Sequence, residues 1–373
     1  MSEDGVGAAE GLALDEALMA GYARTASSRS ATLRLYSYRD HCALVGRYQN
    51  LEAEVDLGAC SRTGTEVGRR LTGGGAIVMG SGQLGVAYVD RAPSDSPARE
   101  TIAALSGALV AGLAAIGIEA SFQGKNDIEV GGRKIAGLGL YLDDAGAMLY
   151  HASVLADLDV AFMLEVLRVP AAKLAERAAT AVSERVTTVS VQTGTSFDAA
   201  GLRPAIARGF EEAFAVALEP GTPDETERAR ADALAESRYR SRAWLGERTM
   251  TGDNSGSSLL KTPAGLMRIY LSTHGTVVKN ALVVGDFNEL PAELVAMEAA
   301  LRWHRLDRDT VLDIVGRTGA AVALGVAPER LAEVVLEAGT QAALSEGARI
   351  PAGSLSALGP ATVATVAETR ATR

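Results

Sequence analysis

The chain has 373 residues, of which 47% are apolar, and a formal net charge of −10. Its length predicts two domains, and its apolar content predicts packed cores, which excludes a largely disordered protein. The acidic balance argues against a protein that binds duplex nucleic acid, because such a protein needs a basic face.

The composition also indicates the compartment. Two cysteines, Cys42 and Cys60, are too few for a disulfide framework, and the four histidines show no metal-ligand spacing. The first residues lack the basic and apolar regions of a signal peptide. Residues 101–118 are uncharged but rich in small side chains, so we expect a buried helix there rather than a membrane span. These features predict a reduced, cytoplasmic protein without a membrane segment.

The first two thirds of the chain mix helical and strand patterns, which predicts an α+β domain. Residues 32–38 and 42–46 flank a turn at Arg39-Asp40 and fit a hairpin, and Gly131-Gly132 predicts a second hairpin within residues 124–137. Further strands are expected at residues 85–89 and 151–155, and helices at residues 11–22, 97–118, 160–167 before Pro170, 198–214 and 224–239.

A polar, turn-rich stretch at residues 252–258 is the best candidate for a domain boundary. It divides the chain into a first domain at residues 1–252 and a second at residues 253–373. Beyond it the pattern predicts a strand pair at residues 266–271 and 276–284, and helices at residues 291–303, 310–316 and 328–336.

The most informative motif is Arg69-Arg70-Leu71-Thr72-Gly73-Gly74-Gly75, followed by an apolar run that predicts a strand. Glycine amides can face a ligand closely, and a guanidinium group matches the oxygens of phosphate or carboxylate. Three glycines also occur at bulges and hairpin turns without a ligand. The two arginines favour an anion-binding loop.

A second group of polar residues suits the same chemistry. A carboxylate such as Asp127, beside Asn126, can hold magnesium that bridges phosphate oxygens, and the ammonium of Lys134 can stabilise charge at a reacting centre. Together with the glycine loop, these residues suit the adenylation of a carboxylic acid by ATP.

At this point the sequence resembles the lipoate–protein ligase family, within the wider group of biotin and lipoate protein ligases. The resemblance rests on motifs in the family's order: Gly46-Arg47-Tyr48-Gln49-Asn50, the loop from Arg69 to Ala76, Asn126-Asp127 with Gly132-Arg133-Lys134-Ile135-Ala136-Gly137, and residues 151–157. It continues into Gly285-Asp286-Phe287 and residues 291–301, which look like the accessory domain of the long-form ligases.

The resemblance implies a mixed α/β catalytic domain and a small C-terminal α/β accessory domain. It implies that lipoate is activated with ATP and Mg²⁺ to lipoyl-AMP and passed to a lysine of a lipoyl domain, in a 2-oxoacid dehydrogenase complex or the glycine-cleavage H protein. Lys134 would be catalytic and Asp127 would bind the metal. The acyl-adenylate would be bound by Arg70, Thr72, Gly73, Gly74, Gly75, Ala76, Val78, Asn126, Gly137 and His151.

Several alternatives stay open. Lys134 also fits a solvated strand-edge lysine, Asp127 fits a turn cap, and His151 fits a buried core histidine. An octanoyl or lipoyl transferase acting through a cysteine thioester is a second reading, although Cys42 and Cys60 both precede the glycine loop. A biotin ligase fits the motifs less well.

One departure from the family pattern favours a third reading. Where relatives commonly place a histidine and an acidic residue, this chain has Met79-Gly80, and Gly11 stands where many carry asparagine. A catalytically impaired acyl-binding homologue is therefore also open. The acceptor protein, the preferred acid and the oligomeric state do not follow from the sequence.

Overall fold

The computed structural model describes residues 1–23, 31–93, 98–123, 126–168, 180, 182–250 and 255–345. Within them the chain forms two compact units. The first contains Met1–Arg47 and Leu51–Glu247, and the second contains Tyr48–Asn50 and the described residues from Arg248 onward. The expected boundary between residues 252 and 253 lies at residues outside the described ranges.

The first unit is built on a mixed sheet of seven strands among the described residues, in the order β1-β2-β6-β10-β9-β8-β7. The strands β1 and β2 are parallel, and the other neighbours are antiparallel. The strand bounds are β1 Ser2–Val6, β2 Thr32–Tyr38, β6 Gln83–Arg91, β7 Ser121–Phe122, β8 Asp127–Val130, β9 Arg133–Leu142 and β10 Ala147–Leu155.

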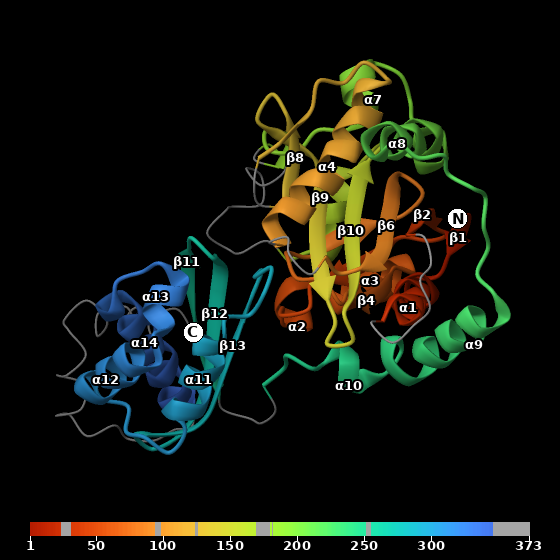
Figure 1. The fold of residues 1–373 in the computed structure, drawn as a ribbon. Helices are drawn as coiled ribbons and strands as arrows, with labels where there is room; N and C mark the ends of the chain where they lie inside the picture. The colour runs from red at the N-terminus through yellow and green to blue at the C-terminus, as the bar shows by residue number, and fades with distance from the viewer. Residues whose placement is uncertain are drawn as a thin grey trace. The chain divides into compact units, whose positions relative to one another are not determined.

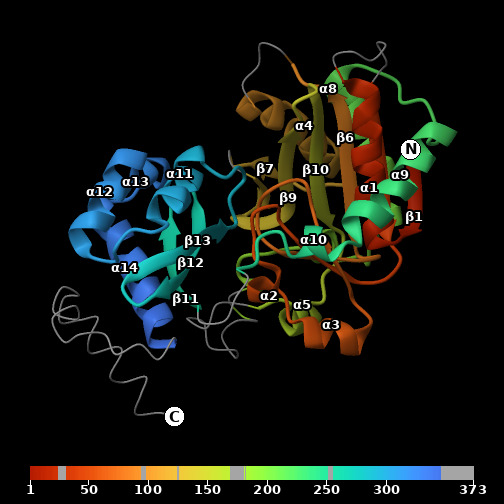
Figure 2. The ribbon, with the colours of Figure 1, turned by 90° about the horizontal axis from the view of Figure 1, so that it is seen from below.

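Helices cover both faces of this sheet (Figures 1 and 2). Alternate residues of each strand face opposite ways, so β6 sends Leu84 and Val86 towards one core and Ala87 and Val89 towards the other. The first core includes α4 (Ala98–Ala114) and α8 (Ala199–Phe214), and the second includes α1 (Ala8–Met19) and α9 (Glu225–Leu234). The expected helices are thus present, although Pro97 and Pro170 lie outside the described residues.

A smaller sheet of described strands, β4-β3-β5, lies in the same unit. Its bounds are β3 Cys42–Val45, β4 Glu66–Arg69 and β5 Ile77–Met79. The remaining short elements of the unit are η1 Ala20–Tyr22, α2 Leu51–Glu54, α3 Leu57–Thr63, α5 Val160–Val166, α7 Val189–Thr193, η2 Ala235–Tyr239 and α10 Arg242–Leu245. The glycine loop connects β4 to β5, so its two ends are fixed by strands that both pair with β3.

The predicted hairpin of residues 32–46 is wrong. The strand β2 is buried along its whole length and pairs with β1 on one side and β6 on the other, so neither edge is available to β3. Consequently β3 joins the smaller sheet. The second predicted hairpin is confirmed, because β8 pairs with β9 and both turn glycines, Gly131 and Gly132, have positive φ angles.

The second unit contains an antiparallel sheet, β11-β12-β13, and helices that pack with it around one core. Its bounds are β11 Ser255–Thr262, β12 Gly265–His274, β13 Val277–Gly285, α11 Ala292–Leu301, α12 Arg308–Thr318, α13 Ala320–Leu324 and α14 Pro328–Ser345. Residues 255–258, which the sequence pattern assigned to a polar, turn-rich stretch, begin the strand β11 instead. Gly256 lies against α14, where a Cβ would come 2.1 Å from the Ala338 carbonyl oxygen.

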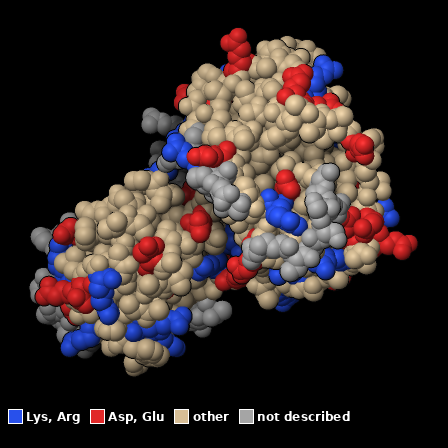
Figure 3. All heavy atoms as spheres, in the orientation of Figure 1, with Lys and Arg blue, Asp and Glu red and all other residues tan. Residues whose placement is uncertain are grey.

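On the face that Figure 3 shows, acidic side chains are scattered over both units, and several basic side chains gather along the lower edge of the second unit. No helix in the described part of the chain is long and apolar enough to cross a membrane.

Candidate acyl-adenylate site

A pocket of about 60 Å³ opens in the first unit between the large sheet and the glycine loop. Polar and apolar side chains both line it. They come from α1, both sheets, the glycine loop and the residue before β8: Leu12, Tyr36, Tyr38, Leu44, Arg70, Thr72, Gly73, Gly74, Gly75, Ile77, Met79, Asn126, Lys134, Gly137, Leu138, Gly139, His151, Ala152 and Ser153.

Lys134 lies at the polar part of the pocket, on β9. Its Nζ is 2.5 Å from Oδ1 of Asp127 on β8, and both side chains are one third exposed. The Lys134 ammonium also lies over Gly137, where a Cβ would come 2.9 Å from Nζ. Glycine at this position therefore leaves room for the ammonium, and the β8–β9 hairpin holds the lysine beside its carboxylate partner.

The glycine loop is held from within by Arg70. The Arg70 guanidinium donates hydrogen bonds to the carbonyl oxygens of Leu44, Gly73 and Gly75 at 2.7 to 3.0 Å. Burial lowers the pKa of Arg70 to about 10. Gly74 has a φ of 89°, a conformation that favours glycine. Arg70 lines the pocket, and its described hydrogen bonds fix the shape of the loop.

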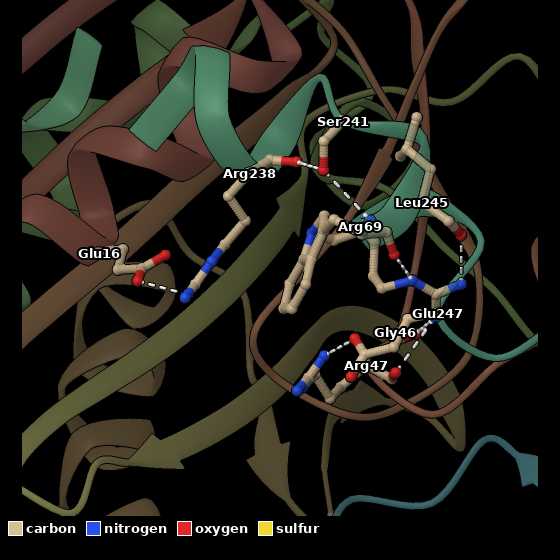
Figure 4. Close-up of polar contacts among 9 residues, drawn as sticks. Glu16, Gly46, Arg47, Arg69, Arg238, Ser241, Leu245 and Glu247 are labelled. Carbon is tan, nitrogen blue, oxygen red and sulfur yellow. Dashed lines mark hydrogen bonds and ion pairs between the residues drawn. The ribbon is translucent and has the colours of Figure 1, made fainter. Parts of the chain in front are cut away.

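The neighbouring Arg69 is fully buried and fastens the loop to two other segments (Figure 4). Its guanidinium donates to the carbonyl oxygens of Gly46 and Arg47, and of Trp244 and Leu245, at 2.7 to 3.1 Å. The Trp244 indole N–H donates back to the Arg69 carbonyl at 3.0 Å. Arg69 therefore joins the start of the loop to the segment that follows β3 and to α10 near the end of the first unit.

The Trp244 ring in turn lies between two arginines. The Arg47 guanidinium is 4.3 Å from the ring centroid and that of Arg238 is 5.2 Å from it. Arg47 forms an ion pair with Glu247, and Arg238 forms one with Glu16 at 2.5 Å (Figure 4). These contacts fix α10 against the loop, and the sequence pattern alone gave no signal for them.

Most of the predicted binding residues meet in this pocket. Arg70, Thr72, the three glycines, Asn126, Lys134, Gly137 and His151 all line it. Asp127 is beside it through its ion pair with Lys134. Ala76 and Val78 instead pack with a separate apolar cluster that includes Ala43 and Val45. Side chains alternate along β5, so Ile77 and Met79 line the pocket and Val78 faces away.

The sequence did not predict the apolar side chains that line the pocket or the buried acidic residue that is hydrogen-bonded to His151. Leu12 and Leu44 belong to an expected helix and an expected strand, and Leu138 lies just beyond the expected hairpin, in the part of β9 that continues to Leu142. The direction in which these side chains face depends on the pairing of distant segments. His151 is hydrogen-bonded through Nε2 to Asp15, which is fully buried on α1. Met79, at the position where a histidine was expected, adds an apolar side chain to the pocket.

Neither cysteine lines the pocket. Cys42 and Cys60 are free and buried, on β3 and α3. Burial raises the pKa of the Cys42 thiol well above its ordinary value. A buried thiol of raised pKa is a poor nucleophile. No cluster of three or more histidine, cysteine or acidic side chains that could hold a metal ion occurs in the described ranges.

Comparison with known proteins agrees with the fold. Residues 7–211 match the lipoyl protein ligase A/B catalytic domain family. The chain therefore belongs to this family of lipoate–protein ligases and octanoyltransferases. It is 30% identical to an octanoyltransferase LipM of Symbiobacterium thermophilum over 258 residues, which covers 63% of this chain and 93% of that protein.

Two solved structures are also similar. The first is a bi-partite lipoate protein ligase, studied with its E2 lipoyl domain, from Thermoplasma acidophilum, with 26% identity and a TM-score of 0.60 over 67% of this chain and 98% of that chain. The second is a lipoate-protein ligase A bound with ATP, with 27% identity and a TM-score of 0.57 over 66% of this chain and 96% of that one. The expected ligase-type α+β fold is confirmed.

Proposed function

We propose that this protein is an ATP-dependent lipoate–protein ligase, which forms lipoyl-AMP with release of pyrophosphate and then passes the lipoyl group to a lysine of an acceptor protein. The observation that carries the proposal is the position of Lys134. Its ammonium lies beside Asp127 and over Gly137, in a pocket that the glycine loop and apolar side chains suited to an acyl chain also line. The similar ligase bound with ATP supports the use of a nucleotide.

In the first half-reaction, a carboxylate oxygen of lipoate attacks the α-phosphorus of ATP. The bond from that phosphorus to the oxygen bridging the β-phosphate breaks, and pyrophosphate leaves. Lys134 stabilises the negative charge shared by the carboxylate and α-phosphate, because a fixed ammonium needs little reorganisation as charge develops. The amides of the loop from Gly73 to Gly75, held by Arg70, contact the same anion.

Magnesium fits this site through one protein carboxylate. Asp127 is partly exposed beside Lys134, and Mg²⁺ is commonly held by one or two carboxylates, with substrate phosphates and water completing the shell. Asp127 and Asn126 are the residues that would hold it. When bound, the ion neutralises charge on the phosphates.

In the second half-reaction, the amine of an acceptor lysine attacks the acyl carbonyl carbon. An amide bond forms, the bond to the phosphate oxygen breaks, and AMP leaves. The similar ligase studied with its E2 lipoyl domain supports an acceptor of this class. We propose lipoyl domains of 2-oxoacid dehydrogenase complexes, or the glycine-cleavage H protein, as acceptors.

The second candidate is an octanoyltransferase, which the similarity to the LipM protein favours. A route through a cysteine thioester lacks a nucleophile, because Cys42 and Cys60 are the chain's two cysteines and neither lines the pocket. A variant with Cys42→Ala and Cys60→Ala therefore discriminates between the two. If the double variant, with folding verified by circular dichroism, still acylates a lipoyl domain, the result supports the ligase. Complete loss of that acylation supports the transferase.

The direct test is exchange of labelled pyrophosphate into ATP in the presence of lipoate or octanoate. Lys134→Ala should reduce exchange by roughly two to four orders of magnitude, the scale of one preorganised charged donor. Arg133→Ala is the matched control, because Arg133 is the adjacent residue of β9 and does not line the pocket. Wild-type exchange in the Lys134 variant, or none in the unmodified protein with any acid, would contradict the proposal.

A further inference from the structure

A buried polar group supports the middle of the pocket. Asp15 of α1 is fully buried and accepts three hydrogen bonds: from Arg34 Nη1 at 2.7 Å, from the Tyr36 hydroxyl at 3.0 Å, and from His151 Nε2 at 2.8 Å. Arg34 is also fully buried and donates from Nε to Glu3 at 2.8 Å. The pocket residue His151 is thus held through its Nε2 atom by a residue of α1.

The two oxygens of Asp15 have different partners. Oδ1 faces Arg34, and Oδ2 faces Tyr36 and His151. Burial alone raises the pKa of Asp15, but the Arg34 charge and the His151 hydrogen bond outweigh it, so the pKa lies below its ordinary value. Asp15 is therefore an anion, which only accepts hydrogen bonds.

This acceptor determines where the imidazole carries its proton. Since Asp15 accepts from Nε2, the neutral ring has its hydrogen on Nε2 and an unprotonated Nδ1. Nδ1 is 3.5 Å from the Thr72 hydroxyl, which can donate to it. Thr72 itself is pressed against Gly139, where a Cβ would come 2.9 Å from its Cβ.

We propose that Asp15 is a positioning residue that keeps His151 in the Nε2-protonated tautomer, so that Nδ1 stays free to accept the Thr72 hydroxyl hydrogen and that hydrogen does not face the acyl chain. The inference rests on the proposed function, in which this pocket holds that chain. In this tautomer the ring N–H ends on Asp15 and the Thr72 hydrogen ends on Nδ1. An alkyl chain can then pass these polar groups without leaving a donor unsatisfied.

The alternative tautomer would oppose binding of an apolar chain. Nδ1–H would point at Thr72, whose own hydroxyl hydrogen would lose its acceptor and turn towards the ligand. A buried donor without a partner is costly, and an alkyl chain offers no acceptor. Of the apolar side chains that line the pocket, Leu12 and Ile77 carry no acceptor, and the Met79 thioether is only a weak one.

The test is Asp15→Asn in the full-length protein at pH 8. Arg34 can only donate, so it selects the amide oxygen, and the amide NH₂ then faces His151 Nε2 and forces the ring proton to Nδ1. Nitrogen NMR of protein labelled in histidine reads the tautomer directly, with the His151 signals assigned by their loss in His151→Gln. Titration calorimetry with lipoate and octanoate reads the affinity.

We expect the wild type to show Nε2–H, and Asp15→Asn to show Nδ1–H with affinity for both acids reduced about tenfold or more. Glu3→Gln is the matched control, because it removes the other acidic partner of Arg34 without touching His151, and should change neither readout. An Nδ1–H tautomer in the wild type would overturn the proposal even if the variant does not fold. So would an inverted tautomer with unchanged affinity.

The two proposals fail in distinguishable ways. If the wild type binds no carboxylic acid, the proposed function is contradicted. If it binds acids but Asp15→Asn leaves the tautomer as in the wild type, the role of Asp15 is contradicted and the ligase proposal stands.

Discussion

Gly46→Ala should disable the glycine loop through a single methyl group. A Cβ at residue 46 would lie 2.0 Å from the carbonyl oxygen of Gly74, whereas contacts below 3.0 Å are essentially never found. The obstacle is backbone rather than a flexible side chain, so the Gly74 peptide or the Gly46 segment must move by about 1 Å. Arg69 and Arg70 hold both segments through carbonyl groups, and the movement therefore disturbs the whole glycine loop.

A displacement of about 1 Å in a positioning element can lower the rate of a reaction about a hundredfold. We expect pyrophosphate exchange with lipoate to fall by that order, while circular dichroism stays as in the wild type. Gly107→Ala is the control, because Gly107 lies within α4 and a Cβ there meets nothing within 4 Å. That variant should keep its activity and gain up to about 1 kcal/mol of stability. Wild-type exchange by Gly46→Ala would refute the role assigned to this close approach.

Three further outcomes are expected. Gly74→Val should abolish the thermal stabilisation by lipoyl-AMP, because the φ of 89° strains a β-branched residue, and retained stabilisation would count against an anion-binding loop. Asp15→Asn should be less stable than the wild type towards urea at pH 7. Because the folded-state pKa of Asp15 is depressed, the difference in the free energy of unfolding should shrink below about pH 4. A difference that does not change with pH would contradict an effect of the Asp15 charge. Removing residues 253–373 should reduce the rate of adenylate formation more than the rate of transfer from preformed lipoyl-AMP, when the two half-reactions are assayed separately. Equal losses in both rates would argue against an accessory role in adenylation.

The parts of the fold that depend on local chemistry were predictable from the sequence. The Gly131-Gly132 turn specifies the β8–β9 hairpin, and that hairpin brings Lys134 to Asp127. The long helices also follow from their apolar periodicity. These features need no knowledge of distant segments, so the motif around Lys134 could be placed correctly.

Features set by distant pairing were not predictable. The strand β2 takes both of its neighbours from elsewhere in the chain, which separates it from β3 despite the short turn between them. Asp15 and His151 are 136 positions apart, and no spacing rule links a helix residue to a strand residue at that distance. The placing of Val78 among the pocket residues failed for a different reason. Residues in a run were treated as one binding segment, but side chains alternate along β5, and Val78 packs in the separate apolar cluster.

The division of the chain into units has a consequence for its covalent continuity. Tyr48–Asn50 belong to the second unit although they precede most of the first, and the Tyr48 carbonyl accepts a hydrogen bond from the Gly285 amide at 3.0 Å. The second unit therefore consists of three residues that interrupt the sequence of the first unit and of a contiguous segment from Arg248 onward. No single cut of the chain would therefore place all residues of each unit in a polypeptide of its own.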